Sequence, residues 1–169
     1  MLIFKLFILI LIVIASSAIG ILFSKKYFNR EKEIKEMKTA LNMFATKIKF
    51  TYEPIPNLFM EIANKIGGNV GNIFEFAANK MKEETAGNAW ETALKEVPHS
   101  FNVEDQAVLK NLSKMLGQTD LEGQLSEIEI VNQFLTSQLE NAGEERRKNE
   151  KMYRTLGLVA GLTIAIILI

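Results

Sequence analysis

The sequence predicts an all-α protein in which a six-helix bundle lies between two transmembrane helices, with the last helix continuous into the second span. Three observations support this fold class. The chain of 169 residues begins and ends with an apolar segment, apolar residues between these segments recur at steps of three and four, and no long run alternates as a β-strand does. The expected domains are a transmembrane helix over residues 1–23, a cytoplasmic helical bundle with stalks over 24–154, and a C-terminal transmembrane helix over 155–169.

The first apolar segment carries one charge, Lys5, over roughly 22 residues from 2 to 23. A helix of this length measures roughly 33 Å, enough to cross the hydrocarbon core of a bilayer, which is about 30 Å thick. A secretory signal peptide is the alternative, with a small-residue cleavage site at residues 16–18. The segment stays apolar through Phe23, whereas a cleavable signal turns polar after its site, so an uncleaved span is favoured.

The second apolar segment, residues 156–169, is shorter at about 14 residues, or roughly 21 Å of helix. A buried core helix is the alternative at this length. Aliphatic residues cover every side of the segment, however, and no polar face remains to meet water. Extending the helix back to Met152, with Tyr153 at the interface and Arg154 reaching outward, gives about 18 residues and favours a second span.

Lys and Arg residues gather beside both apolar segments, although the formal net charge of the whole chain is zero. Translocation disfavours cations near span ends, so the sequence predicts a multi-pass cell membrane protein with a cytoplasmic central domain and both termini outside. The middle, residues 39–144, carries 8 Lys and Arg against 15 Asp and Glu, a net charge of −7, which is unsuited to nucleic acid. A basic protein partner is one interpretation of this charge, and a solvated acidic surface that aids solubility is the alternative. The flanking cations are Lys25, Lys26, Arg30, Lys32, Lys35 and Lys38 on one side and Arg146, Arg147, Lys148, Lys151 and Arg154 on the other.

An apolar stripe along residues 30–53 predicts a long amphipathic helix, which Pro54 and Pro56 end. A second helix is expected over residues 57–66. The run "GGNVGN" that follows predicts a turn and no phosphate site, because it lacks the Lys and the Ser or Thr of a phosphate loop and follows no strand. A third helix is expected over residues 70–81. The stripe on the first helix consists of Ile34, Met37, Leu41, Phe44, Ile48 and Tyr52.

The segment "NAWETALKEV" predicts a fourth helix with Trp90 as a core anchor. Asn102 is expected to cap a fifth helix that has two acidic residues in its first turn. Gly117 is expected to end this helix in the left-handed conformation, and residues 119–122 match a capping box that starts a sixth helix. No proline follows, so the sixth helix is expected to run for about 50 residues into the second apolar segment.

Residues that carry chemistry are sparse in this sequence. The absence of cysteine excludes disulfides, thiol catalysis and thiolate metal sites. The single histidine, His99, follows Pro98 and is expected to be a solvated loop residue. No acid and base pair, activated nucleophile or metal-ligand spacing is recognisable, so no catalytic, cofactor-binding or metal-binding residue is predicted and an enzyme is disfavoured.

Small residues occur four positions apart in each apolar segment. Ser16 and Gly20 form one pair, and Gly157 and Gly161 form the other. Such pairs let two transmembrane helices approach closely, so these four residues are predicted to form a helix-packing site. Neither segment carries an ionisable residue at mid-depth, which disfavours proton or ion transport.

Three stretches give the chain a resemblance to a known family. They are "AWETAL", the turn "LGQTDLEGQ" and, as the most specific, the ending "ERRKNEKMYRTLGLVAGLTIAIILI". Together with the N-terminal span they resemble the stage III sporulation protein AB family of endospore-forming bacteria, over essentially the whole chain. By this resemblance the protein would belong to an apparatus that the mother cell builds in the outer forespore membrane. The family is similar to the cytoplasmic helical domain of the platform proteins of type II secretion and type IV pilus systems.

The resemblance implies a non-enzymatic membrane platform, a scaffold component of a secretion-like transenvelope channel needed for endospore formation. The partners that it implies are other stage III sporulation proteins, notably the AA protein, a secretion-type ATPase, and further copies of the chain. Neither a cofactor nor nucleic acid is expected. The alternative function is a membrane-anchored regulatory adaptor or sensor, whose stalks signal a change at the membrane to a cytoplasmic partner.

Overall fold

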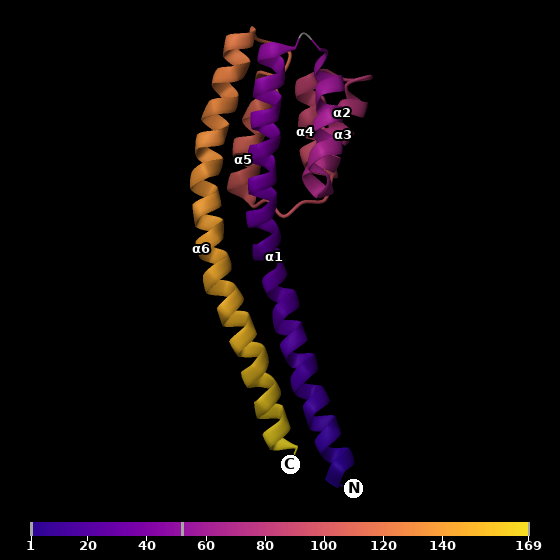
Figure 1. The fold of residues 1–169 in the computed structure, drawn as a ribbon, viewed down its shortest axis with the longest axis vertical. Coiled ribbons are helices and arrows are strands. Elements are labelled where there is room, and N and C mark those ends of the chain that lie inside the picture. The colour runs from indigo at the N-terminus through magenta and orange to yellow at the C-terminus, as the bar shows by residue number, and fades with distance from the viewer. Residues whose placement is uncertain (1, 52, 169) are drawn as a thin grey trace. The chain divides into compact units, whose positions relative to one another are not determined.

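The structure, a computed structural model, describes residues 2–51 and 53–168, and within these ranges it contains helices and no strand. The predicted all-α class is therefore confirmed. Met1, Tyr52 and Ile169 lie outside the described residues, and with them the parts of the predictions that fall on these three positions. The helices are α1 (Leu2–Phe50), α2 (Ile55–Ile66), α3 (Gly68–Lys80), α4 (Ala86–Glu96), α5 (Val103–Asn111), a short 3₁₀ helix η1 (Leu112–Lys114) and α6 (Leu121–Ile167) (Figure 1).

The two longest helices, α1 and α6, each join an apolar segment to a polar one. The sequence predicts this continuity for the last helix, and α6 is one helix of 47 residues. The first apolar segment is continuous in the same way, because α1 runs unbroken for 49 residues. No glycine or proline occurs between Gly20 and Pro54, so nothing in that stretch interrupts the backbone hydrogen bonds.

Among the described residues, one helix is long and apolar enough to cross a membrane, namely α1 over Phe7–Phe50, in which an 18-residue stretch has a mean hydropathy of 2.7. This finding indicates membrane association near the N-terminus. The C-terminal segment is not long and apolar enough by the same comparison, which allows at most two charged residues in 18. The 18 residues that end with α6 at Ile167 include three, Glu150, Lys151 and Arg154. The second span therefore stays a prediction.

The chain forms two compact units. We call the first, Met1–Glu31 with Asn141–Ile169, the terminal pair, and the second, Lys32–Glu140, the central unit. The terminal pair consists of the N-terminal part of α1 and the C-terminal part of α6, which run antiparallel, as Figure 1 shows. The central unit contains the remaining parts of these two helices together with α2 to α5.

An aromatic cluster forms the core of the central unit. Phe59 lies at its centre, with ring centroids 5.1 Å from Phe44, 4.8 Å from Phe74 and 5.8 Å from Trp90. The edge-to-face geometry of these pairs is favourable for aromatic rings. All four side chains are at most 1% exposed, and the Trp90 Nε1–H donates a hydrogen bond of 2.8 Å to the carbonyl oxygen of Leu109. The rings bring α1, α2, α3 and α4 together, and the expected role of Trp90 as a core anchor is confirmed.

The turn after α2 is shorter than the sequence predicts. Gly67 and Gly68 have positive φ angles of 66° and 59°, and the backbone N–H of Gly67 caps α2 by donating to Ala63. Helix α3 begins at Gly68, two residues before its expected start at residue 70, so the turn is limited to the two glycines and "NVGN" is helical. Gly71 fits inside a helix here because a Cβ at this position would lie 2.8 Å from the Ala63 carbonyl oxygen. A small residue is needed for close packing of α3 on α2.

Two predicted helix starts have different outcomes. Asn102 caps α5 as expected, in a full capping box with Asp105. The cap of α6 is Asp120, whose Oδ1 accepts from the N–H of Gly123 at 2.9 Å, and the predicted capping box of residues 119–122 is wrong. Thr119 is not free to serve as the cap, because its hydroxyl donates back to the carbonyl oxygen of Met115. Gly117 has the expected positive φ, 71°, but α5 already ends at Asn111 and η1 follows it, so the prediction that Gly117 ends this helix is wrong.

Candidate functional site

The four small residues predicted to pack helices lie together in the terminal pair. The Ser16 hydroxyl donates a hydrogen bond of 2.7 Å to the carbonyl oxygen of Gly157. A Cβ at Gly20 would overlap the carbonyl oxygen of Tyr153, and one at Gly157 would lie 2.9 Å from the carbonyl oxygen of Ser16. A Cβ at Gly161 would lie 3.1 Å from the Ser16 side chain. The two backbones thus approach so closely that larger side chains would not fit without a shift of the helices.

Aromatic side chains extend the contact between α1 and α6 from the glycines toward the charged residues. The ring of Tyr153 stacks between those of Phe23 and Tyr27, at centroid distances of 6.1 and 6.2 Å. Tyrosine is favoured where an apolar environment meets a polar one, because its ring is apolar and its hydroxyl is polar. The cluster lies on the sequence at the point where both segments change from apolar to charged.

Two arginines cross-link the charged part of the terminal pair. Arg30, which is 6% exposed, forms an ion pair of 2.7 Å with Glu145. Arg146 forms an ion pair of 3.3 Å with Glu31 and lies over the ring of Phe28, with 4.6 Å from its guanidinium carbon to the ring centroid. Arginine suits position 146 because its planar guanidinium group can pair with a carboxylate and stack on an aromatic ring at the same time.

Sequence reasoning treated Arg30 and Arg146 only as cations that set topology and missed their acidic partners. The partners lie 115 residues away along the chain in both cases. The sequence did contain a signal for these ion pairs. Glu31 follows Arg30 and Glu145 precedes Arg146, so each glutamate comes next to the arginine of the other segment when the two segments are aligned in antiparallel order. That alignment becomes readable only once the glycine contacts have fixed the register of the helices.

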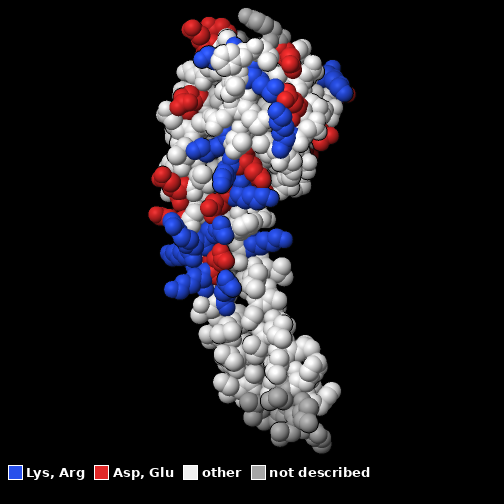
Figure 2. All heavy atoms as spheres, in the orientation of Figure 1, with Lys and Arg blue, Asp and Glu red and all other residues white. Residues whose placement is uncertain are grey.

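Six further cations of the terminal pair lie at the surface. Figure 2 shows Lys and Arg gathered in a band next to an uncharged surface. We call this band the collar. It consists of the exposed residues Lys25, Lys26, Arg147, Lys148, Lys151 and Arg154.

Most of the large apolar side chains that the structure describes in the terminal pair are exposed. Phe7 is 62% exposed, Leu22 66% and Ile167 77%. The inward positions are held by small residues, with Gly20, Gly157, Gly161 and Ala165 buried. A surface of this kind is unfavourable in water and fits an apolar solvent such as lipid.

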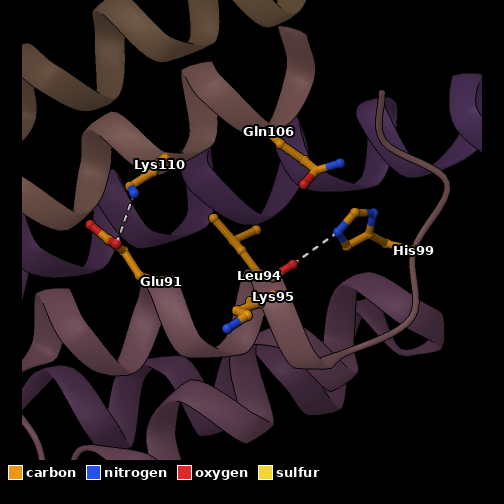
Figure 3. Close-up of a pocket in the computed structure, with 6 residues that line it drawn as sticks. All are labelled: Glu91, Leu94, Lys95, His99, Gln106 and Lys110. Carbon is orange, nitrogen blue, oxygen red and sulfur yellow. Dashed lines mark hydrogen bonds and ion pairs between the residues drawn. The ribbon is translucent and has the colours of Figure 1, made fainter. Parts of the chain in front are cut away.

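A small pocket of about 390 Å³ lies in the central unit beside His99, between α4 and α5 (Figure 3). The His99 Nε2 is 2.9 Å from the carbonyl oxygen of Leu94, its ring packs on Phe101, and its Nδ1 is buried with no partner. His99 lies in a loop as expected, but the expectation that it is solvated is wrong, because the loop after α4 folds back onto its own helix end. Glu91 pairs with Lys110 across the pocket at 3.1 Å, and no nucleophile stands beside the histidine among the labelled lining residues.

A buried carboxylate joins three parts of the central unit. Glu33 on α1 is 4% exposed and accepts hydrogen bonds from the Asn69 side chain on α3 at 2.8 Å and from the backbone N–H and hydroxyl of Ser100. The bonds hold the loop before α5 against α1. Sequence reasoning missed this residue, since "REKEIKEM" reads as an exposed charged run in which one glutamate does not differ from the next.

In the part of the chain that the structure describes, no group of three or more His, Cys, Asp or Glu residues could hold a metal ion. The other features described above are surfaces, packing contacts and a small pocket. The terminal pair, with its outward apolar surface, its glycine contacts and its collar, is the best-developed of them.

Comparisons with known proteins agree with one another. The model of the family described as "Stage III sporulation protein AB" matches residues 5–169. A curated stage III sporulation protein AB from Bacillus subtilis (strain 168) is 27% identical over 163 residues, which cover 94% of this chain and 95% of that protein. A solved structure of stage III sporulation protein AB (SpoIIIAB) has a TM-score of 0.67 and 22% sequence identity, and the match covers 71% of this chain and 98% of that chain, which shows a shared fold.

Proposed function

The chain belongs to the stage III sporulation protein AB family, and from this premise we propose that it acts as a non-enzymatic membrane platform in a sporulation complex. The terminal pair anchors the platform in the cell membrane, and the central unit receives other components of the complex. The complex is a secretion-like transenvelope channel in the outer forespore membrane, facing the mother cell.

The observation that carries the proposal is the inverted packing of the terminal pair. Most of its large apolar side chains are exposed and its small residues face inward. A water-soluble helix pair has the opposite arrangement, because burial of large apolar side chains is what drives its association. In a bilayer, close backbone contact and interhelical hydrogen bonds such as Ser16 to Gly157 stabilise the pair instead.

The proposed topology is a hairpin with residues 1–23 and 155–169 in the membrane and residues 24–154 in the cytoplasm. The collar supports this orientation, since cations near span ends are retained on the cytoplasmic side. The C-terminal apolar segment is short for a span, and close packing on the longer first segment would compensate for the mismatch.

The proposed partner of the central unit is the secretion-type ATPase, the AA protein of the same sporulation stage. The central unit carries 11 Lys and Arg against 16 Asp and Glu, a net charge of −5, which favours a partner with a basic surface. In the family, the platform and the ATPase would transmit movement through the helices that enter the membrane.

Topology is tested with single cysteines, since the natural chain has none. Lys82→Cys probes the central unit at an exposed position, and a cysteine added after residue 169 probes the C-terminus. We expect a membrane-impermeant thiol reagent to label only the C-terminal cysteine on intact cells and both cysteines after permeabilisation. Labelling of Lys82→Cys on intact cells would place the central unit outside and overturn the platform.

The partner is tested by co-purification of the ATPase with the full chain from sporulating cells in several mild detergents. We expect the ATPase to be retained by the wild-type chain and lost at high salt, because the proposed contact is electrostatic. Absence of the ATPase in every detergent would count against this partner and leave the topology unaffected.

A further inference from the structure

We propose that the collar on α6 binds an anionic phospholipid, with the phosphate between Arg147, Lys151 and Arg154 and an acyl chain along Leu158 and Leu162. The inference rests on the proposed membrane function and names the lipid class that the anchor selects. It requires a pocket of the right charge, cations that the protein leaves available, and an apolar surface directly beyond them.

The pocket lies on the outer side of α6 in the terminal pair. It has a volume of about 430 Å³ and is lined by Arg147, Glu150, Lys151, Arg154 and Thr155. Three of these five side chains are cationic, and the threonine hydroxyl can donate a further hydrogen bond. A phosphodiester is a compact anion with several acceptor oxygens, which matches converging Lys and Arg donors.

Of the three cations at the pocket, only Arg154 forms an ion pair with an acidic residue nearby, within the described part of the chain. Glu31 and Glu145 pair with Arg146 and Arg30, away from the pocket. Glu150 is shared between Arg146 at 3.4 Å and Arg154 at 3.6 Å. Arg147 and Lys151 are exposed and form no ion pair with any residue that the structure describes.

An apolar track continues from the cations along the same face of the helix. Leu158 follows Arg154 by four residues and Lys151 by seven, and Leu162 follows Leu158 by four, so all lie on one side of α6. Leu158 is 48% exposed and Leu162 46% exposed. A free phosphate ion would use the cations and leave this track unused, whereas a phospholipid occupies both, so the geometry favours the lipid.

The helix contact occupies a neighbouring face of this part of α6, at buried positions. Gly157 and Gly161 are buried against α1 in the terminal pair. The lipid site and the glycine contact therefore use different faces, and neutralising the collar leaves the packing of the two helices intact. This separation makes the site testable without loss of the fold.

The test uses the full chain, reconstituted in bilayers of phosphatidylcholine with a minor fraction of phosphatidylglycerol. After gentle extraction in detergent, the lipids retained by the protein are measured by mass spectrometry. We expect phosphatidylglycerol to be enriched about tenfold over its bulk fraction with the wild-type chain. The variant Arg147→Gln/Lys151→Gln/Arg154→Gln should show almost no enrichment, and Lys151→Gln alone should lose about fivefold, because each cation near an anionic surface contributes a similar factor.

The matched control, Lys49→Gln/Lys82→Gln/Lys95→Gln, removes three exposed cations from the central unit and should retain the enrichment. Equal loss in this control, no enrichment with the wild-type chain, or displacement of the lipid by excess inorganic phosphate would each overturn the lipid site. Extraction of the membranes with alkaline carbonate separates this failure from that of the proposed function. A wild-type chain that resists carbonate but shows no enrichment keeps the anchor and loses the lipid site, whereas release by carbonate overturns both.

Discussion

The terminal pair and the central unit are both made of α-helices, but they are stabilised by opposite arrangements of side chains. The central unit buries its large residues around Phe59 and Trp90 and exposes its charges. The terminal pair buries glycines such as Gly20 and Gly157 and exposes its large apolar residues. Their charges are opposite as well, with 9 Lys and Arg against 4 Asp and Glu in the terminal pair, or +5, and −5 in the central unit.

This difference supports the proposal that the terminal pair lies in lipid and the central unit in water. In water the hydrophobic effect stabilises the burial of large apolar groups, at roughly 25 cal/mol per Å². In lipid that driving force is absent between helices, so contact depends on close approach and hydrogen bonds. Substitutions that change side-chain size should therefore have opposite consequences in the two units.

The largest effect is expected in the core of the central unit. Trp90→Ala removes a fully buried ring and its hydrogen bond to Leu109, and should lower the free energy of unfolding by about 3–5 kcal/mol. The measurement is urea unfolding of the full chain in mild detergent, followed by circular dichroism. The control Phe134→Ala, at a position 56% exposed on α6, should change the free energy of unfolding by less than about 0.5 kcal/mol. Similar losses in both variants would show that the aromatic cluster is not the stabilising core.

A second large effect is expected at the buried carboxylate. Glu33→Ala leaves the Asn69 side chain and the Ser100 backbone N–H without their acceptor and should cost about 2–3 kcal/mol in the same unfolding measurement. Glu75→Ala, at an exposed position on α3, is the matched control and should be close to neutral. A neutral Glu33→Ala would mean that water replaces the carboxylate without penalty.

In the terminal pair, the addition of a single methyl group should destabilise. Gly20→Ala places a Cβ against the carbonyl oxygen of Tyr153 and should weaken the helix contact by about 1–3 kcal/mol. Cysteines introduced at Phe23 and Tyr153, whose rings stack in the parent chain, report the contact through the yield of their disulfide on mild oxidation. We expect a lower yield when Gly20→Ala is added.

The control for this substitution is another glycine of the same unit. A Cβ at Gly143 would meet nothing closer than the flexible end of Glu31, at 3.8 Å. Gly143→Ala should therefore leave the disulfide yield unchanged and raise helix stability by about 0.5–1 kcal/mol, because alanine favours the helix over glycine. If both substitutions reduce the yield equally, the contact does not depend on the close approach at Gly20.

The smallest effect concerns pH and the pocket of the central unit. The Ser113 hydroxyl, followed by the Lys110 ammonium, holds the pKa of Glu91 below its ordinary value of 4.5. Because the folded-state pKa is lowered, the stabilisation is present above pH 4.5 and is lost as the pH falls through the folded-state value. Glu91→Gln should remove this part of the acid sensitivity, by a few tenths of a kcal/mol, since the carboxylate is partly exposed. Unfolding curves at pH 7 and at about pH 3.5 that shift equally in both proteins would contradict this role.

Much of the helical structure follows from local sequence signals. The cap at Asn102, the positive φ of Gly117 and the breaks around Pro54 depend on residues a few positions apart, and each occurs where it is expected. The predictions that were wrong also concerned local structure, where a neighbouring residue took the role that was expected of another. Asp120 caps α6 in place of Thr119. The turn after α2 is shorter than expected, and "NVGN" joins α3, because positive φ angles at the two preceding glycines already complete the turn.

The sequence by itself determined the all-α class, the apolar ends, the change from apolar to charged residues and the small-residue spacing, since each is a pattern within one helix. Only the tertiary structure decided which residues meet. The Ser16 bond to Gly157 joins residues 141 apart, and Arg30 and Glu145 are 115 apart. Helical periodicity fixes which face a residue occupies but not which helix lies opposite that face. Backbone approach at the glycines sets the register of the pair, and that register selects the partners of the charged residues.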